Sequence, residues 1–268
     1  CLTMLKNLKY ILIPISILFF ALNFIHYNII EDKQVLIIRE KYNPSLNRLN
    51  TLDKLESYVD SMANVKNITT GTLTYAVLAR NVVSKRFYHK YATQDLNENW
   101  IASVTQKITG LYLSSKITAD DILKKPYGYC GQQCAVLMEL LMKKNIPVRA
   151  LYLPHHFVIQ AYINEQWCFF DVDKEPDVLE EQRFNKDWLF NQDSLAIAYK
   201  TDLQTIAYNF GSPVNIRYGK INEEQGKNAQ LFQSITSVLS KIAFIFPLGL
   251  FFYLEKKNKK KQKNLNQE

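Results

Sequence analysis

The pattern of apolar and polar residues divides this 268-residue chain into two apolar ends and a mixed middle. From Tyr10 to Ile30 no Lys, Arg, Asp or Glu occurs in 21 positions. At about 1.5 Å per residue, that length crosses roughly 30 Å of hydrocarbon. The stretch from Phe232 to Leu254 is also apolar, although its uninterrupted part, 242–254, has 13 residues. We therefore expect transmembrane helices over 10–30 and 232–254.

Each apolar segment has a competing interpretation. The first has the composition of a cleaved signal peptide, but no A-x-A-like cleavage site follows it. The second contains Lys241, which would have to reach the membrane surface or face protein if the segment spans. A re-entrant or interfacial helix therefore stays open for residues 232–254.

The residues after the first apolar segment show helical spacing. Apolar residues recur every three or four positions over Ser45–Met62, and similar amphipathic patterns cover Thr72–Tyr88 and Asn99–Leu113. We expect a mainly helical part over 31–115.

The pattern changes character after Pro126. A helix is predicted over Cys130–Lys144, and Asn145-Ile146-Pro147 ends it because proline disfavours helix at the residue before it. Three short β-branched and aromatic runs follow and predict strands, with Asn164-Glu165 as a two-residue hairpin turn between the last two: 148–153, 157–163 and 166–172. The expected class is α+β, a helix packed on an antiparallel sheet, with this core and a C-terminal extension over 116–230.

The net charge of +8 belongs to the chain ends. Residues 31–230 contain 24 Lys/Arg and 23 Asp/Glu, whereas the flanks contain 9 and 2. Basic residues beside apolar segments indicate cytoplasmic ends, here 1–9 and 255–268. We therefore expect a two-pass protein of the inner cell membrane, with the lipid bilayer as a partner and 31–230 outside. A nucleic-acid partner is not expected, because the middle of the chain carries almost no excess positive charge.

Cys130 has the position of a reactive thiol. The four cysteines, Cys1, Cys130, Cys134 and Cys168, are too few and too unevenly spaced for a disulfide scaffold. Cys130 opens the predicted helix, where unpaired backbone N–H groups favour the thiolate and can stabilise an oxyanion. Cys134 lies one turn deeper and is interpreted as a small core residue.

The hairpin brings a histidine and two carboxylates to one face. If Ile163 pairs with Gln166, paired residue numbers sum to 329. His156, Asp171 and Asp173 then share a face, and His155 points to the other. A Cys–His pair oriented by a third group is the minimum apparatus for thiol acyl transfer.

The stretch GYCGQQCAVLMELLMKKNIPVRALYLPHHFVIQAYINEQWCFFDVD resembles the core of the transglutaminase-like superfamily, which has a papain-like fold. That family has Gly-x-Cys opening a helix, then a "GIPAR"-like element, a strand led by His, a Trp, and an Asp four residues later. Here the pattern falls on Gly128-Tyr129-Cys130, 145–149, His156, Trp167 and Asp171. The resemblance implies a catalytic triad of Cys130 as nucleophile, His156 as base and Asp171 as the orienting group.

Some positions depart from the family pattern. Asn145 replaces the usual Gly, Val158 a common aromatic, Gln160 a frequent Glu, and Val172 a Pro. These departures leave the substrate class open.

The resemblance implies a cysteine protease or amidase (a hydrolase), or an acyltransferase. Such an enzyme acts on peptide or protein amides through a Cys thioester, without a cofactor or metal. The basic ends of the chain place this reaction outside the membrane. The substrate-binding candidates are Gln132, Gln133 and Trp167. The sequence leaves the oligomeric state open.

Two other functions remain. The first is a catalytically silent transglutaminase-like binding module in an envelope or surface-polysaccharide system. The second is a zinc site formed by Cys130, Cys134, His155 and His156, which the opposite orientation of adjacent strand residues disfavours.

Overall fold

The structure, a computed structural model, describes residues 2–30, 41–178, 181–184, 191–211 and 216–265. The chain forms two compact units. The larger unit comprises 32–92 and 116–226, and the smaller comprises 1–31, 93–115 and 227–268. Residues 93–115, expected within the helical part 31–115, thus belong with the chain ends. Cys1 and residues 31–40 lie outside the described residues.

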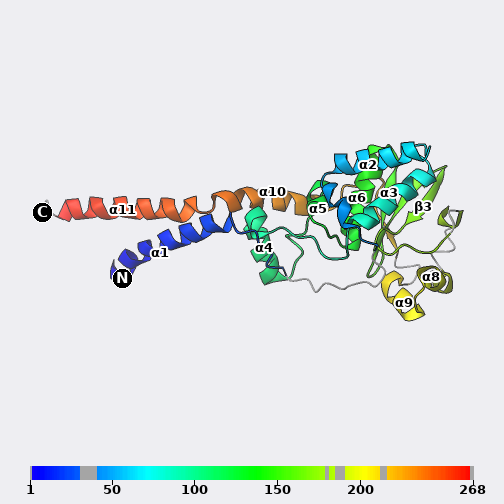
Figure 1. Cartoon of the computed structure of the whole chain (residues 1–268). Coiled ribbons are helices and arrows are strands. Elements are labelled where there is room, and N and C mark those ends of the chain that lie inside the picture. Colours follow the sequence, from blue (N-terminus) through cyan, green and yellow to red (C-terminus); the bar gives the residue numbers. More distant parts are fainter. Residues whose placement is uncertain (1, 31–40, 179–180, 185–190, 212–215, 266–268) are drawn as a thin grey trace. The chain divides into compact units, whose positions relative to one another are not determined.

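An antiparallel sheet forms the middle layer of the larger unit (Figure 1). Its strands run in the order β3-β2-β1-β4 and are β1 (Val148–Tyr152), β2 (Phe157–Ile163), β3 (Gln166–Phe170) and β4 (Arg217–Tyr218). Ile163 pairs with Gln166, and Asn164 and Glu165 have φ of 50° and 63°. Positive φ at both positions is what a type I′ hairpin turn requires. The predicted turn and register are confirmed.

One face of the sheet packs against the helices that carry the main core. Alternate strand residues, among them Ala150, Ile159 and Phe170, are fully buried in this core. The helices on this side are α2 (Leu52–Val65), α3 (Leu73–Arg86) and α6 (Cys130–Lys143). The α+β class is confirmed, with a helix packed on an antiparallel sheet.

The opposite face of the sheet packs against a second, smaller core. Leu151, Val158 and Phe169 point to this side, because they alternate with the residues of the main core. The helices here are α8 (Gln192–Tyr199) and α9 (Leu203–Phe210). The sequence assigned no element to this part of the chain. Short elements complete the larger unit: η1 (Pro44–Arg48), α5 (Ala119–Leu123) and η2 (Glu181–Phe184).

Helix boundaries follow local capping rather than the apolar pattern alone. The helix expected over 45–62 is split into η1 and α2, because the Thr51 hydroxyl accepts from the Lys54 N–H and starts a new helix. α6 begins directly after Tyr129, whose backbone is extended, and Asn145 turns away with φ 57°. The sequence placed the start of α6 correctly at Cys130.

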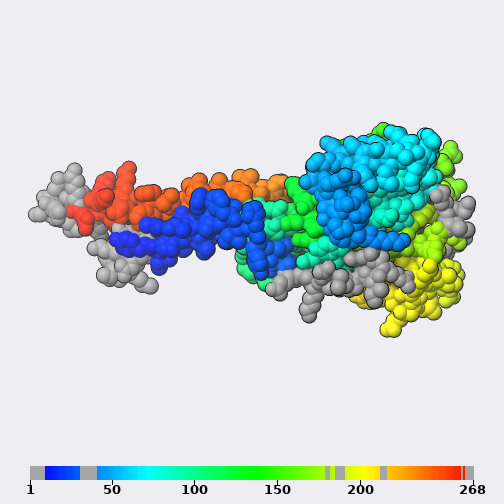
Figure 2. All heavy atoms as spheres, viewed as in Figure 1, coloured from blue at the N-terminus to red at the C-terminus, as the bar shows by residue number. Residues whose placement is uncertain are grey.

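The smaller unit consists of helices. They are α1 (Leu2–Leu22), α4 (Leu96–Thr109), α10 (Lys227–Ile242) and α11 (Ile245–Leu265). α1 lies beside α11 (Figures 1 and 2), and α4 packs on α10 (Figure 1). In the part of the chain that is described, no single helix is both long and apolar enough to cross a membrane. By length and composition alone, α10 and α11 meet that requirement as a pair, bent by 46° at their break.

Arg86 joins three separate segments of the larger unit. The residue is 1% exposed, and its guanidinium donates to the carbonyls of Leu49, Leu123 and Lys125 and to Asn47 Oδ1. Burial lowers the pKa of Arg86 to about 10, although a nearby tyrosine partly opposes that effect. The guanidinium thus stabilises the chain segments that flank α2 and α5.

Replacing Arg86 should destabilise the larger unit strongly. In Arg86→Met the buried acceptors lose their donors, and we expect a loss of about 3 kcal/mol in the free energy of unfolding. Denaturant unfolding of the full chain in detergent measures this loss. Lys124→Ala, which removes an exposed ion pair with Asp121, should change stability by less than about 1 kcal/mol. Equal effects of the two substitutions would contradict the role given to Arg86.

Candidate active site

The Cys130 thiol lies in the first turn of α6. The backbone N–H groups of Cys130 and Gly131 belong to this turn, where the helix provides no carbonyl acceptors. The partial positive charge of the helix N-terminus therefore acts on the sulfur and on any oxyanion formed beside it. The residue is 4% exposed, so a substrate must displace neighbouring side chains to reach the sulfur.

His156 connects Cys130 to Asp171. It directly precedes β2, and Asp171 directly follows β3, so the hairpin brings the two side chains together. His156 Nε2 lies 2.6 Å from Asp171 Oδ2, and the His156 side chain also hydrogen-bonds Cys130. Since Nε2 faces the carboxylate, Nδ1 is the ring nitrogen left for the thiol. The structure brings the three sequence-predicted residues into one chain of contacts.

Asp171 is fully buried and has a partner for each oxygen. Besides His156, Oδ2 accepts from the Tyr199 hydroxyl at 2.9 Å. Oδ1 accepts from the backbone N–H groups of Asp173 and Lys174 at 3.1 and 2.9 Å. Burial alone would raise the pKa of Asp171, but the charge of His156 and these hydrogen bonds hold it below its ordinary value.

The same contacts act in the opposite direction on the imidazole. Burial alone would lower the pKa of His156, but the charge and hydrogen bond of Asp171, together with Cys130, raise it to about 10. A protonated His156 beside a carboxylate and a thiol is the charge arrangement that supports a thiolate nucleophile.

Tyr199 is a site residue that the sequence did not reveal. It ends α8, 28 residues after Asp171, in a region without a recognisable motif. Burial and the charge of Asp171 raise the pKa of Tyr199 well above its ordinary value. Its hydroxyl therefore stays protonated and donates to the carboxylate.

The other cysteines have environments that disfavour reaction. Cys134 is fully buried and donates to the Phe157 carbonyl, and burial raises its pKa. Cys168 is also buried, and burial raises its pKa to about 12. The interpretation of Cys134 as a small core residue is confirmed.

The three substrate-binding candidates have structural contacts. Gln132 donates its amide hydrogens to the carbonyls of Ala92 and Lys116, at 2.7 and 2.9 Å, and cannot also donate to a substrate. Gln133 donates to Gly128 O and Asp173 Oδ1. Trp167 lies in β3 beneath the guanidinium of Arg149. A substrate-binding role for Gln132 and Trp167 stays a prediction, and Gln133 lines the cavity next to His156.

Asp173 forms a second histidine pair beside the first. His89 Nδ1 lies 2.7 Å from Asp173 Oδ1, and the Asp173 side chain is 3% exposed. Asp173 Oδ2 is buried without a hydrogen-bond partner. His89 precedes the recognised stretch by about forty residues, so nothing in the sequence linked it to the site. His155 lies apart, stacked on Tyr208.

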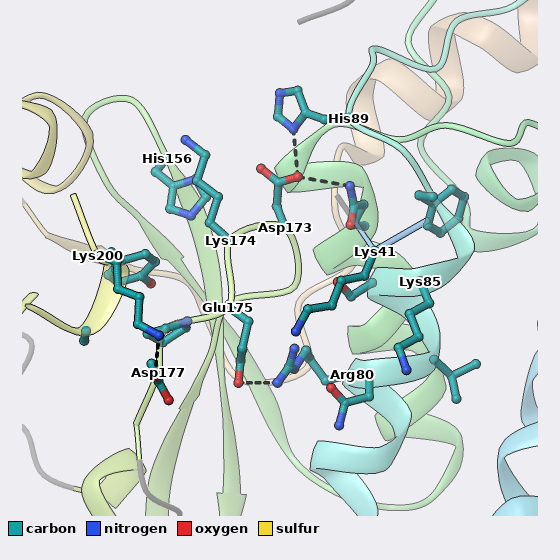
Figure 3. A pocket seen from close by; sticks show the side chains of 18 of the residues that line it. Lys41, Arg80, Lys85, His89, His156, Asp173, Lys174, Glu175, Asp177 and Lys200 are labelled. Carbon is teal, nitrogen blue, oxygen red and sulfur yellow. Dashed lines mark hydrogen bonds and ion pairs between the residues drawn. The ribbon is translucent and has the colours of Figure 1, made fainter. Parts of the chain in front are cut away.

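A large cavity of about 1140 Å³ opens beside His156 (Figure 3). Its described lining includes His156, Gln133 and Asp173 but not Cys130. Six Lys/Arg side chains and three carboxylates line it, a balance of +3: Lys41, Lys66, Arg80, Lys85, Lys174 and Lys200, against Asp173, Glu175 and Asp177. In Figure 3, Lys41 and Lys85 lie across from His156 and Lys174. The cavity therefore has the electrostatic character of an anion-attracting site.

A buried ion cluster forms one wall of this cavity. Arg80 and Arg183 both donate to Glu175 Oε1, and Glu175 Oε2 and both arginine Nε atoms lack hydrogen-bond partners. Burial lowers the pKa of Arg80 to about 10, while Glu175 opposes this effect. One carboxylate thus neutralises two guanidinium groups only in part.

Within the described ranges, no group of three or more His, Cys, Asp or Glu side chains is arranged to hold a metal ion. The chain matches no known protein-family profile, no curated protein and no solved structure.

The stability of the larger unit should depend on pH through His156 and Asp171. The pKa of His156 is raised, so its contribution is fully present below about pH 6.5 and is lost as pH rises toward its folded value. The pKa of Asp171 is lowered, so its contribution is present above about pH 3.9 and is lost in stronger acid. As pH rises from about 6.5 to 10, the denaturant midpoint of His156→Gln should therefore fall less than that of wild type. The midpoint of His155→Gln should change with pH as that of wild type does. If the midpoint of His156→Gln also changes as in wild type, the ionisation of His156 does not contribute to stability.

The positive cavity should favour anionic reagents at Cys130. The measured quantity is the rate of Cys130 alkylation by iodoacetate divided by the rate with iodoacetamide. This ratio should be roughly two- to fivefold lower in Lys174→Glu than in wild type. Lys54→Glu, an exposed lysine of α2 outside the cavity, is the matched control. The difference should disappear at high salt. If the ratio of the iodoacetate rate to the iodoacetamide rate is the same in Lys174→Glu and Lys54→Glu, the cavity charge does not act on the thiol.

Proposed function

We propose that this chain is a membrane-anchored, transglutaminase-like cysteine enzyme that acts on amide bonds. The observation that supports the proposal is the contact chain from Asp171 through His156 to Cys130 at the start of α6. A thiol, an imidazole and a carboxylate in that order are the groups that thiol acyl transfer requires.

The proposed reaction has two steps. The Cys130 thiolate attacks the amide carbonyl, and the first N–H groups of α6 stabilise the negative oxygen of the tetrahedral intermediate. His156 then gives its proton to the leaving amine as the C–N bond breaks, which produces a thioester. In the second step His156 removes a proton from water or from an acceptor amine, and that group attacks the thioester carbonyl. The C–S bond then breaks, which releases the acyl product and restores the Cys130 thiolate. Hydrolysis and transamidation thus differ only in the acceptor.

Asp171 has an orienting role in this proposal. Its carboxylate holds the imidazole with Nε2 toward itself and Nδ1 toward the sulfur, and it stabilises the imidazolium. Tyr199 and the two backbone N–H groups keep Asp171 ionised and fix its position. Tyr199 is therefore a positioning residue rather than a catalytic one.

The proposed location follows from the charge distribution. The basic ends flank the apolar segments, and a bilayer would therefore hold both ends on its cytoplasmic side. The larger unit would face the outside, where peptides and envelope proteins are the available amide substrates.

The second candidate is a catalytically silent binding module. The burial of Cys130, and its absence from the described lining of the cavity, favour this alternative. The two candidates differ in one measurable property, the reactivity of the thiol.

Iodoacetamide labelling of the full chain in detergent at neutral pH distinguishes the two candidates. An enzyme should show labelling of Cys130 well ahead of Cys134 and Cys168, slowed by roughly 10-fold or more in His156→Ala. Tyr199→Phe should give an intermediate rate, because Asp171 keeps its other partners. Slow labelling of all three thiols, unaffected by His156→Ala, would support the silent module instead.

A further inference from the structure

Two helices of the smaller unit, α4 and α10, bury polar side chains and have exposed apolar residues on or next to them. On α10 the buried side chains are Gln233, Thr236 and Ser240. The exposed ones form an apolar stripe at helical spacing: Leu231, Ile235, Val238, Leu239 and Ile242. A water-exposed amphipathic helix has the reverse arrangement.

α4 also buries polar side chains, together with the apolar Leu96 and Ala102, and Lys107 near its end is exposed. Asn99, Ser103 and Gln106 are buried at 0%, 0% and 6% exposure. Just beyond them Ile108, Leu111 and Tyr112 are 79%, 59% and 68% exposed. An exposed apolar cluster of this kind is expected where a surface contacts lipid or another protein.

The polar faces of α4 and α10 satisfy one another. The Asn99 amide donates to Thr236 Oγ1 at 2.8 Å and to Gln233 O at 3.2 Å, and its oxygen accepts from Ser240 Oγ at 3.0 Å. Asn99 leaves helical geometry, with φ −161°, to make these contacts.

Two further hydrogen bonds join α4 and its neighbouring residues to α10. Trp100 Nε1 donates to Ser240 O at 3.1 Å, and the Lys241 ammonium donates to the Asn97 carbonyl. Lys241, the one charge within the second apolar segment, makes this contact while its side chain remains exposed. Without α4, α10 would present these polar groups to its surroundings.

The length of the C-terminal span requires α10 to enter the bilayer. The uninterrupted apolar residues 242–254 cover about 20 Å, less than the roughly 30 Å of hydrocarbon. About seven more residues are needed, which extends the span to Ile235. Thr236 and Ser240 would then lie at membrane depth, where unpaired polar groups are costly. α4 covers them.

We propose that α4 is embedded in the outer leaflet, where it covers the polar face of α10 and completes the C-terminal span. Ile108, Leu111 and Tyr112 contact lipid acyl chains there. The inference rests on the membrane attachment proposed above and adds a third membrane element, drawn from the middle of the chain.

Lipid-dependent quenching of a tryptophan at position 112 tests this placement. The full chain carrying Tyr112→Trp, with Trp100, Trp167 and Trp188 changed to Phe, is reconstituted into phosphatidylcholine–phosphatidylglycerol vesicles with brominated acyl chains. The matched control is Val65→Trp in the same background, because Val65 is an 82% exposed apolar residue of the larger unit. Bromolipid should quench Tyr112→Trp roughly fivefold more than Val65→Trp, and aqueous iodide should show the reverse order.

The outcomes separate the two proposals. If the chain does not float with vesicles, both the membrane attachment and the embedding of α4 are wrong. If it floats but iodide quenches Tyr112→Trp as strongly as Val65→Trp, only the embedding of α4 is wrong. Protection from both quenchers would indicate that a protein, such as a second copy of the chain, covers α4 and would also overturn the proposal. Tyr112→Cys labelled with an NBD fluorophore, in a chain whose four native cysteines are changed to Ser, repeats the measurement with the tryptophans retained.

Discussion

The site depends on one ionised carboxylate held in a fully buried position. Asp171 can be buried as a charge only because His156, Tyr199 and two backbone N–H groups satisfy its oxygens. Those partners come from the start of β2, the end of α8 and the turn after β3. The requirement to pair this charge therefore fixes the hairpin, α8 and the imidazole in one arrangement, and Cys130 is placed against the imidazole by the start of α6.

The buried His156–Asp171 pair and the neighbouring cavity are different electrostatic environments. His156 and Asp171 are shielded from water, which strengthens their interaction. The cavity beside them carries excess positive charge and a guanidinium cluster around Glu175 that is only partly neutralised. A protected charge pair next to an open, charged space is a common arrangement of enzyme sites. In the proposed enzyme, this charge would favour a substrate that carries negative charge near the amide.

The two units follow opposite rules of burial. The larger unit buries apolar side chains on both faces of its sheet, as a domain in water does. The smaller unit buries amides and hydroxyls and exposes leucine, isoleucine and phenylalanine. These rules correspond to two solvents, water and the proposed bilayer.

The sequence by itself determined the features that depend on neighbouring residues. The helix start at Cys130, the Asn164-Glu165 turn and the shared face of His156 and Asp171 all follow from local periodicity and turn chemistry. Only the tertiary structure decided the contacts between distant segments. Three hydrogen bonds join residues that no local pattern relates: those of Tyr199 with Asp171, of His89 with Asp173, and of Asn99 with Thr236 on α10. The physical reason is that a side chain's partner at long range is set by how whole elements pack, whereas periodicity reports only which face of its own element it occupies.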